Sequence, residues 1–171
     1  PIASHIYGVG FGNNTFVAVG LSGKIVRSTD NGATWDNATS PTSNYLYTVG
    51  FGNNTFVAGG SGGNIVRSTD NGSSFDNVTS PTTTLLFGVE FGNNTFVAVG
   101  TSGIIVRSTD NGTTWDNVTS PTGEDLRGFR FGNNTFVAAG YSGNILRSTD
   151  NGSSFDNVTS PTANNLWGVA F

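Results

Sequence analysis

The chain has 171 residues, among them 25 glycines and no cysteine, and its formal net charge is −4 at pH 7. Seven basic residues are few for neutralising a phosphate backbone, which argues against a nucleic-acid partner. No apolar run approaches the roughly 18 residues of a membrane-spanning helix, so we expect no membrane insertion. The lack of cysteine excludes disulfides and thiolate metal sites and leaves the compartment undetermined. Of the locations open to it, we favour an extracellular or secreted one.

In chain order, a strand-like run at 6–11 leads into FGNNTFVAVG, which begins at Phe11 and returns almost unchanged at Phe51, Phe91 and Phe131. The chain therefore repeats a forty-residue unit without insertions. Val, Thr, Phe and turn residues dominate, which is typical of an all-β protein with many short strands. Because the chain opens at Pro1 and has no Met, we expect a processed or excerpted form of the gene product.

The second unit contains four strand-like runs, at 46–51, 55–59, 64–68 and 74–78. Gly and Asn separate them, and both tolerate the positive φ angles of tight hairpin turns. Three hairpins and one longer, Pro-containing return predict β-propeller blades of four antiparallel strands. We expect a single propeller domain or half-ring over 1–171. Its repeats are 11–50, 51–90, 91–130 and 131–170, and its flanking inner strands are 6–11 and 166–171.

The inner-strand segment occurs five times, whereas the other three strands occur four times each. A closed ring of four blades would therefore have one inner strand too many. The aromatic residue at the end of the third turn alternates as Trp35, Phe75, Trp115 and Phe155, which indicates a duplicated eighty-residue unit and an even number of blades. We favour two chains that complete one eight-bladed ring. A four-bladed monomer and an excerpt from a longer propeller or filament are the alternatives.

The turn between the third and fourth strands follows the pattern S-x-D-x-G-x-[ST]-[WF]. We expect Asp30 to accept backbone hydrogen bonds, Gly32 to adopt a conformation that other residues resist, and Trp35 to bury its ring against a blade. These roles belong to folding, and none needs a substrate. The structural residues of the four turns are Ser28, Asp30, Gly32, Trp35, Ser68, Asp70, Gly72, Phe75, Ser108, Asp110, Gly112, Trp115, Ser148, Asp150, Gly152 and Phe155.

This pattern resembles the Asp-box, or BNR repeat, of sialidase-like propellers. The wider unit, G-V-x-F-G-N-N-T-F-V-A-V-G-x-S-G-x-I-V-R-S-T-D, is similar to Asp-box propellers of the photosystem-assembly-factor-like kind. The resemblance covers nearly the whole chain and implies the propeller fold. It implies no single activity, since Asp-box propellers include glycosidases, lectins, receptors and assembly factors.

The charged residues do not predict an enzyme, and we expect no catalytic residue, cofactor or metal. The resemblance to sialidases would imply an arginine cluster and a Tyr nucleophile activated by Glu, but the FRIP-type motif is missing and no Tyr–Glu pair is evident. Most acidic residues recur once per repeat, so the ring would spread them apart. The same holds for Arg27, Arg67, Arg107 and Arg147, which we expect to pair with nearby acids.

Positions at which the repeats differ are the candidates for recognition, because loops and inner strands line the end of a propeller channel. We predict that the aromatic and charged residues among them contact a glycan or a protein surface: His5, Tyr7, Tyr45, Tyr47, Phe87, Glu90, Arg127, Arg130, Tyr141 and Trp167. Drift at exposed positions would produce similar variation. The sequence thus favours a non-catalytic binding module that completes an eight-bladed ring by homodimerisation. The alternative is a self-assembling scaffold, recently amplified or engineered, with no specific ligand.

Overall fold

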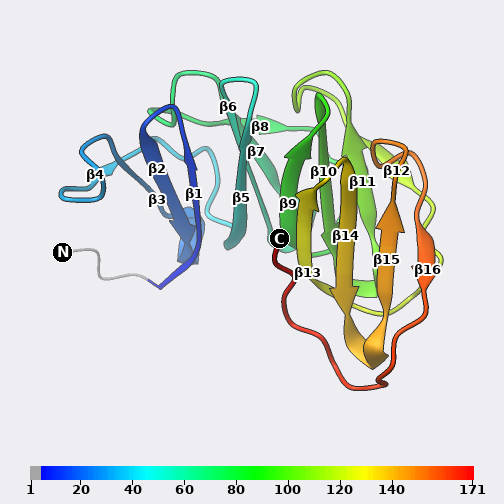
Figure 1. Cartoon of the computed structure of the whole chain (residues 1–171). Coiled ribbons are helices and arrows are strands. Elements are labelled where there is room, and N and C mark those ends of the chain that lie inside the picture. The colour runs from blue at the N-terminus through cyan, green and yellow to red at the C-terminus, as the bar shows by residue number, and fades with distance from the viewer. Residues whose placement is uncertain (1–4) are drawn as a thin grey trace.

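The computed structural model describes residues 5–171, which form four antiparallel sheets of four strands each (Figure 1). Each sheet uses four strands that are consecutive in the chain, and we number these sheets blade 1 to blade 4. The blades stand side by side, from blade 1 at the left of Figure 1 to blade 4 at the right. The expected all-β propeller architecture is therefore confirmed.

The strands have nearly the same length in every blade. Blade 1 consists of β1 (Ile6–Gly12), β2 (Thr15–Gly20), β3 (Ile25–Ser28) and β4 (Asp36–Asn37). Blade 2 consists of β5 (Leu46–Gly52), β6 (Thr55–Gly60), β7 (Ile65–Ser68) and β8 (Asp76–Val78). Blade 3 consists of β9 (Leu86–Gly92), β10 (Thr95–Gly100), β11 (Ile105–Ser108) and β12 (Asp116–Val118). Blade 4 consists of β13 (Leu126–Gly132), β14 (Thr135–Gly140), β15 (Ile145–Ser148) and β16 (Asp156–Val158).

Three turns join the strands within each blade. The first is a two-residue turn, in which Asn13 and Asn14 have φ angles of 46° and 54°, a left-handed region that Asn enters more readily than most residues. The second is a short 3-10 turn, and the four copies are η1 (Leu21–Gly23), η2 (Ser61–Gly63), η3 (Thr101–Gly103) and η4 (Tyr141–Gly143). The third is the turn that carries the repeated Asp, and we call it the box turn, with its box aspartate (Asp30 in blade 1) and box glycine (Gly32 in blade 1). These are the hairpins that Gly and Asn predict from the sequence.

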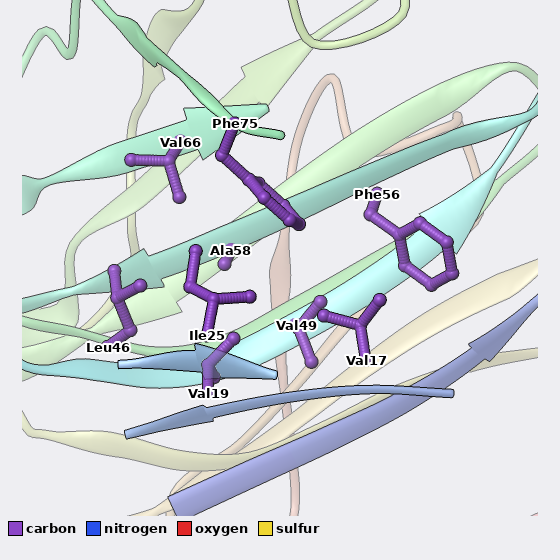
Figure 2. Close-up of a cluster of buried hydrophobic side chains, with 9 residues drawn as sticks. All are labelled: Val17, Val19, Ile25, Leu46, Val49, Phe56, Ala58, Val66 and Phe75. Atoms are coloured by element: carbon purple, nitrogen blue, oxygen red, sulfur yellow. The ribbon is translucent and has the colours of Figure 1, made fainter. Parts of the chain in front are cut away.

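The hydrophobic core lies between neighbouring blades. Figure 2 shows the cluster between blades 1 and 2, to which blade 1 contributes Val17, Val19 and Ile25. Blade 2 contributes Leu46, Val49, Phe56, Ala58, Val66 and Phe75. Equivalent clusters join blade 2 to blade 3 and blade 3 to blade 4. Because each buried Val, Leu or Phe contributes roughly 1.5–3 kcal/mol, packing between blades is a main source of stability.

Polar contacts repeat across the same boundaries between blades. The Asn71 side chain donates a hydrogen bond to Thr15 Oγ1 over 2.7 Å, and Asn111 donates to Thr55 Oγ1 over 2.6 Å. The box glycine of the following blade leaves room for a valine. A Cβ on Gly72 would lie only 2.6 Å from Val17 Cγ2. Each boundary is therefore specified by hydrogen bonds and by close packing.

Blade 1 has an apolar face that no other blade covers in the described part of the chain. Val9 is 62% exposed, while its counterpart Val49 is 8% exposed. Trp35 is 37% exposed, while its counterpart Trp115 is 6% exposed. An apolar cavity of about 290 Å³ on this face is lined by Ile6, Val9, Ala18, Val26 and Trp35. We call this surface the front face of blade 1.

Blade 4 has the complementary surface, which no other blade of residues 5–171 covers and which we call its back face. The apolar residues that blade 3 packs against blade 4 are Val97, Val99 and Ile105, and their counterparts in blade 4 are Val137, Ala139 and Ile145. Val137 and Ile145 are partly exposed, whereas Val97 and Ile105 are fully buried. A cavity of about 440 Å³ on this side is lined by residues of 142–145 and 157–163.

The segment 166–171, expected to be an inner strand, forms no strand ladder in the structure. It nevertheless runs beside β13, on the inner side of the blades (Figure 1). Phe171 packs over Gly132 in the same way that Phe51 packs over Gly12. The segment therefore occupies the place of a next inner strand, but the described part of the chain holds no free second strand with which it could pair.

Candidate functional site

Each of the four turns that carry the repeated Asp has the same pattern of hydrogen bonds. In blade 3, Ser108 Oγ donates to Asp110 Oδ1 over 2.8 Å and accepts from the backbone N–H of Gly112 over 2.9 Å. Thr114 donates to Asp110 through its backbone N–H, at 2.9 Å, and through its hydroxyl, at 2.6 Å. The indole N–H of Trp115 closes the turn on the carbonyl oxygen of Gly112 at 3.1 Å. Blades 1, 2 and 4 repeat the Ser, Asp and Ser/Thr bonds.

These hydrogen bonds stabilise the charged form of the box aspartates. The hydrogen bond from the Thr34 hydroxyl lowers the pKa of Asp30 to about 2. The Ser154 hydroxyl acts in the same way on Asp150, whose pKa is also about 2. Burial raises the pKa of Asp110, but hydrogen bonds from Thr114 and Ser108 outweigh it and lower that pKa to about 2. Carboxylates held in this way are acceptors within a turn and are poorly suited to proton transfer at neutral pH.

Among residues 5–171, none of the four repeated arginines forms an ion pair with an acid, so that expectation from the sequence is wrong. Arg67 Nε donates to the backbone carbonyl of Asn111 over 2.7 Å, and Arg107 Nε donates to that of Asn151 over 2.8 Å. The side-chain stem of Arg67 crosses to the next blade and passes over Gly112. Its guanidinium group therefore reaches the turn of that blade and binds an oxygen there.

The inner strands bring together the most variable position of the repeat. Tyr7 stacks on Tyr47 with ring centroids 4.9 Å apart, and Tyr47 meets the edge of Phe87 at 5.8 Å. The guanidinium carbon of Arg127 lies 3.7 Å from the centre of the Phe87 ring and 5.8 Å from that of Trp167. Tyr7, Tyr47, Phe87, Arg127 and Trp167 thus form one continuous line of side chains across five inner segments. We call this line the inner row.

Arg127 is the most heavily contacted member of the inner row. It donates to Asp125 Oδ2 and to the hydroxyl of Tyr141, each over 2.9 Å. Tyr141 in turn meets the edge of Trp167, with ring centroids 5.4 Å apart. The Nε atom of Arg127 is buried and has no hydrogen-bond partner among the described residues.

A second charged pair lies near Arg127. Arg130 Nη1 donates to Glu90 Oε1 over 2.6 Å, across the boundary between blades 3 and 4. Burial raises the pKa of Glu90 above its usual range, and the charge of Arg130 opposes this shift. A cavity of about 210 Å³ lies between these groups, lined by residues that include Phe87, Arg127, Arg130 and Trp167. Aromatic residues and two arginines are therefore among the residues that line the cavity.

The structure groups nine of the ten predicted binding residues. Tyr45 joins the inner row through Tyr47, with ring centroids 6.5 Å apart. His5 lies exposed just before β1, and the contacts that join the row do not include it. The predicted binding set leaves out Asp125, which orients Arg127 and also accepts the backbone N–H of Ser102 over 3.0 Å. The sequence signal that could have placed Asp125 in the site is its position two residues before Arg127, in a loop that departs from the repeat.

Two further properties of residues 5–171 bear on the class of site. They contain no group of three or more His, Cys, Asp or Glu side chains placed to hold a metal ion. No helix in this range is long and apolar enough to cross a membrane.

The blades, their order and the inner row define a β-propeller, and solved propellers resemble this chain in fold. YCF48 bound to a D1 peptide superposes with a TM-score of 0.75 at 18% identity, over 99% of this chain and 58% of that one. YCF48 from Cyanidioschyzon merolae superposes with a TM-score of 0.75 at 18% identity, over 100% of this chain and 62% of that one. An ancestral GH74 enzyme superposes with a TM-score of 0.74 at 20% identity, over 92% of this chain and 24% of that one.

The likeness at these identities concerns the fold. The chain spans about three fifths of the length of the two YCF48 structures. A structure of a nidogen/laminin complex also superposes, with a TM-score of 0.76 at 10% identity, over 97% of this chain and 68% of that one. No protein-family model and no curated protein matches the sequence.

Proposed function

We propose that this chain is a non-catalytic binding propeller that holds a segment of another protein against its inner row. The observation that carries the proposal is the continuous contact from Tyr7 through Tyr47, Phe87 and Arg127 to Trp167. Tyr, Trp and Arg are the side chains that most often dominate protein interfaces. Propellers of the same fold are seen with a D1 peptide and in a laminin complex, which supports a protein ligand over other classes.

The departures from the repeat support the same site. The equivalents of Glu90 and Arg130 in blades 1 and 2 are Gly10 and Gly50, so this ion pair occurs at one boundary between blades. Asp125, Arg127 and Tyr141 lie beside it and contact one another. Changes that contact one another in space are the arrangement expected of a specific site, whereas drift has no reason to gather them.

The carboxylates near the cavity support a non-catalytic role. Glu90 is paired with Arg130, and Asp125 is paired with Arg127. A glycosidase needs two carboxyl groups that face one substrate, one of them free to donate a proton. Here each carboxylate is held by its own guanidinium group, which favours binding over acid catalysis.

Two copies of the chain, we also propose, complete one eight-bladed ring. The front face of blade 1 has the residues that covered blades bury, and the back face of blade 4 has the residues that cover them. The alternation of Trp and Phe in the box turns favours an even number of blades. Each joint between copies then repeats the boundary seen within the chain, and closure leaves no uncovered blade.

Peptide display tests the binding proposal with a probe of random sequence. A 12-residue peptide library is selected on the wild-type chain, and enriched peptides are measured by calorimetry. We expect Arg127→Ala and Tyr47→Ala each to weaken binding at least about tenfold, because hot-spot residues contribute about 2 kcal/mol or more and about 1.4 kcal/mol corresponds to a factor of ten. Asp76→Ala, at an exposed outer-strand position, is the matched control and should leave binding unchanged.

The other functions give different results in parallel assays. Selective binding on a glycan array, with no enriched peptide, would establish a lectin in place of a peptide-binding propeller. A chain that binds neither probe, and tolerates Tyr47→Ala and Arg127→Ala, would be a scaffold. Hydrolysis of a fluorogenic glycoside that disappears in Glu90→Gln would contradict the non-catalytic assignment.

Light scattering tests the ring directly. The chain has a mass of 17.7 kDa, so the proposed dimer has about 35 kDa. A species that stays at the mass of one chain up to millimolar concentration would refute the eight-bladed ring and leave the binding proposal standing.

A further inference from the structure

At each joint of the proposed ring, two strands compete for the same inner-strand position. Blade 1 supplies β1 as its inner strand, paired with β2 from Ile6 opposite Gly20 to Gly12 opposite Thr15. The segment 166–171 already occupies the equivalent place beside blade 4. When blade 1 of a second copy docks on the back face of blade 4, only one of these strands can remain.

The contacts of 166–171 reproduce those of a regular inner strand. Leu166 donates its backbone N–H to the carbonyl oxygen of Gly140 over 2.9 Å. Asn165 Oδ1 accepts the N–H of Ser142 over 3.1 Å, just as Asp125 Oδ1 accepts the N–H of Ser102 over 3.0 Å. The loop before the segment is also regular.

That loop holds its shape with the bonds used in blade 3. Ser160 Oγ donates to the carbonyl oxygen of Thr162 over 3.1 Å, and Ser120 Oγ donates to that of Thr122 over 3.0 Å. The segment and its loop are therefore docked as a unit. What the segment lacks is a partner for its free edge.

We propose that 166–171 stays in place and pairs with β2 of the second copy, from which the second copy's own β1 is released. This inference rests on the proposed eight-bladed ring. By the register of the repeat, Val169 would lie opposite Ala18 of the second copy, as Val49 lies opposite Ala58 within blade 2. The two copies then exchange one strand at each joint.

Three considerations favour the segment 166–171 over β1 at this position. Exchange replaces each backbone hydrogen bond between β1 and β2 by an equivalent bond, so the ladder itself is nearly neutral. The docking contacts of 166–171 and its loop are retained, and its free edge becomes paired. Leu166 also supplies the residue found at the fully buried positions Leu46, Leu86 and Leu126, where β1 has Ile6.

The exchange has a consequence for the binding site. Trp167 is 64% exposed in the single chain, on the side where the inner row ends. In the ring it would stand between Arg127 of its own copy and Tyr47 of the second copy, and Tyr7 would leave the row. Each ligand site then contains residues of both copies, so binding at the row depends on the ring.

Hydrogen exchange on the unmodified protein tests the inference. Under conditions where light scattering shows the dimer, amides of 167–171 should exchange at least about 100-fold more slowly than in an unstructured chain. Amides of 7–11 should exchange at close to the unstructured rate. Protection of 7–11 with rapid exchange in 167–171 overturns the exchange of strands and leaves the ring intact. A monomeric mass overturns both proposals.

Cysteine pairs give an independent readout, since the chain has no cysteine of its own. In the variant with Val169→Cys and Ala18→Cys, mild oxidation should link two copies into a covalent dimer, because opposed strand residues lie within disulfide range. The pair Val49→Cys and Ala58→Cys is the control and should close within one chain. The pair Val9→Cys and Ala18→Cys should stay reduced in the dimer. Its closure there, without a link in the first variant, overturns the proposal.

Discussion

Two equivalent glycines give a sharp test of how the blades pack. Gly32 and Gly72 occupy the same position of the box turn, with φ angles of 83° and 78°. A Cβ on Gly72 would lie 2.6 Å from Val17 Cγ2, which belongs to the neighbouring blade and is fully buried. A Cβ on Gly32 would meet nothing within 4 Å among the described residues, because the front face of blade 1 is uncovered.

The two alanine substitutions should therefore differ in their effect on the free energy of unfolding. Both place alanine in the left-handed region, at about 1–2 kcal/mol. Gly72→Ala also forces Val17 or the turn to move, and overpacking of this kind costs about 1–3 kcal/mol. We expect losses of about 1–2 kcal/mol for Gly32→Ala and about 2–5 kcal/mol for Gly72→Ala in the monomer.

Urea denaturation of both variants beside the wild type measures the difference. The comparison is made at dilutions where the wild type is monomeric by light scattering. Equal losses in the free energy of unfolding for the two variants would refute the inference that the front face of blade 1 is uncovered. At concentrations where the ring forms, Gly32 should face Val137 of the second copy. The effect of Gly32→Ala should then approach that of Gly72→Ala, and it should also shift the monomer–dimer equilibrium toward the monomer.

Three other outcomes can be measured on the same protein. Ser108→Ala should lower the free energy of unfolding in urea by about 1–2 kcal/mol, since the N–H of Gly112 loses a buried acceptor. Thermal melts should show stability falling as the pH drops from about 4 to about 2. The native pKa of Asp110 lies below its unfolded value, so stability is lost as protonation begins, and Asp110→Asn should flatten this part of the profile. Acrylamide should quench Trp35 more strongly than Trp115 in the monomer, and dimerisation should remove the difference.

The sequence predicts the interior of each blade well, because local chemistry determines it. Asn13 and Asn14 sit at positive φ, as the hairpin rule requires, and the strands begin and end within two residues of the predicted runs. The box turn is likewise a local structure, since Asp110 accepts hydrogen bonds from residues at most four positions away. Such features do not depend on the neighbouring blade.

Features that depend on the neighbouring blade are harder to predict. Arg67 lies opposite Asp76 in the sheet, which favours an ion pair, but its side chain crosses to Asn111 on the next blade. The segment 166–171 has the sequence of a strand, but it has no ladder because pairing needs a β2 that this chain uses elsewhere. In both cases the direction of packing between blades decides the outcome, and a single repeat contains no information about it.

The candidate site depends both on the local sequence of each blade and on contacts with the neighbouring blade. Its positions could be found because they break the repeat, but their contacts could not, since they are made across blades. In a strictly repeated ring, every blade would have a Glu at the position equivalent to Glu90. Each such Glu would face another Glu in the neighbouring blade, and the like charges would repel. Glu90 is compatible with the ring because Arg130 follows it one repeat later, 2.6 Å away. Departures from the repeat must therefore be matched in adjacent blades, so specificity in such a propeller is acquired boundary by boundary, and at the boundary between blades 3 and 4 this match is an ion pair.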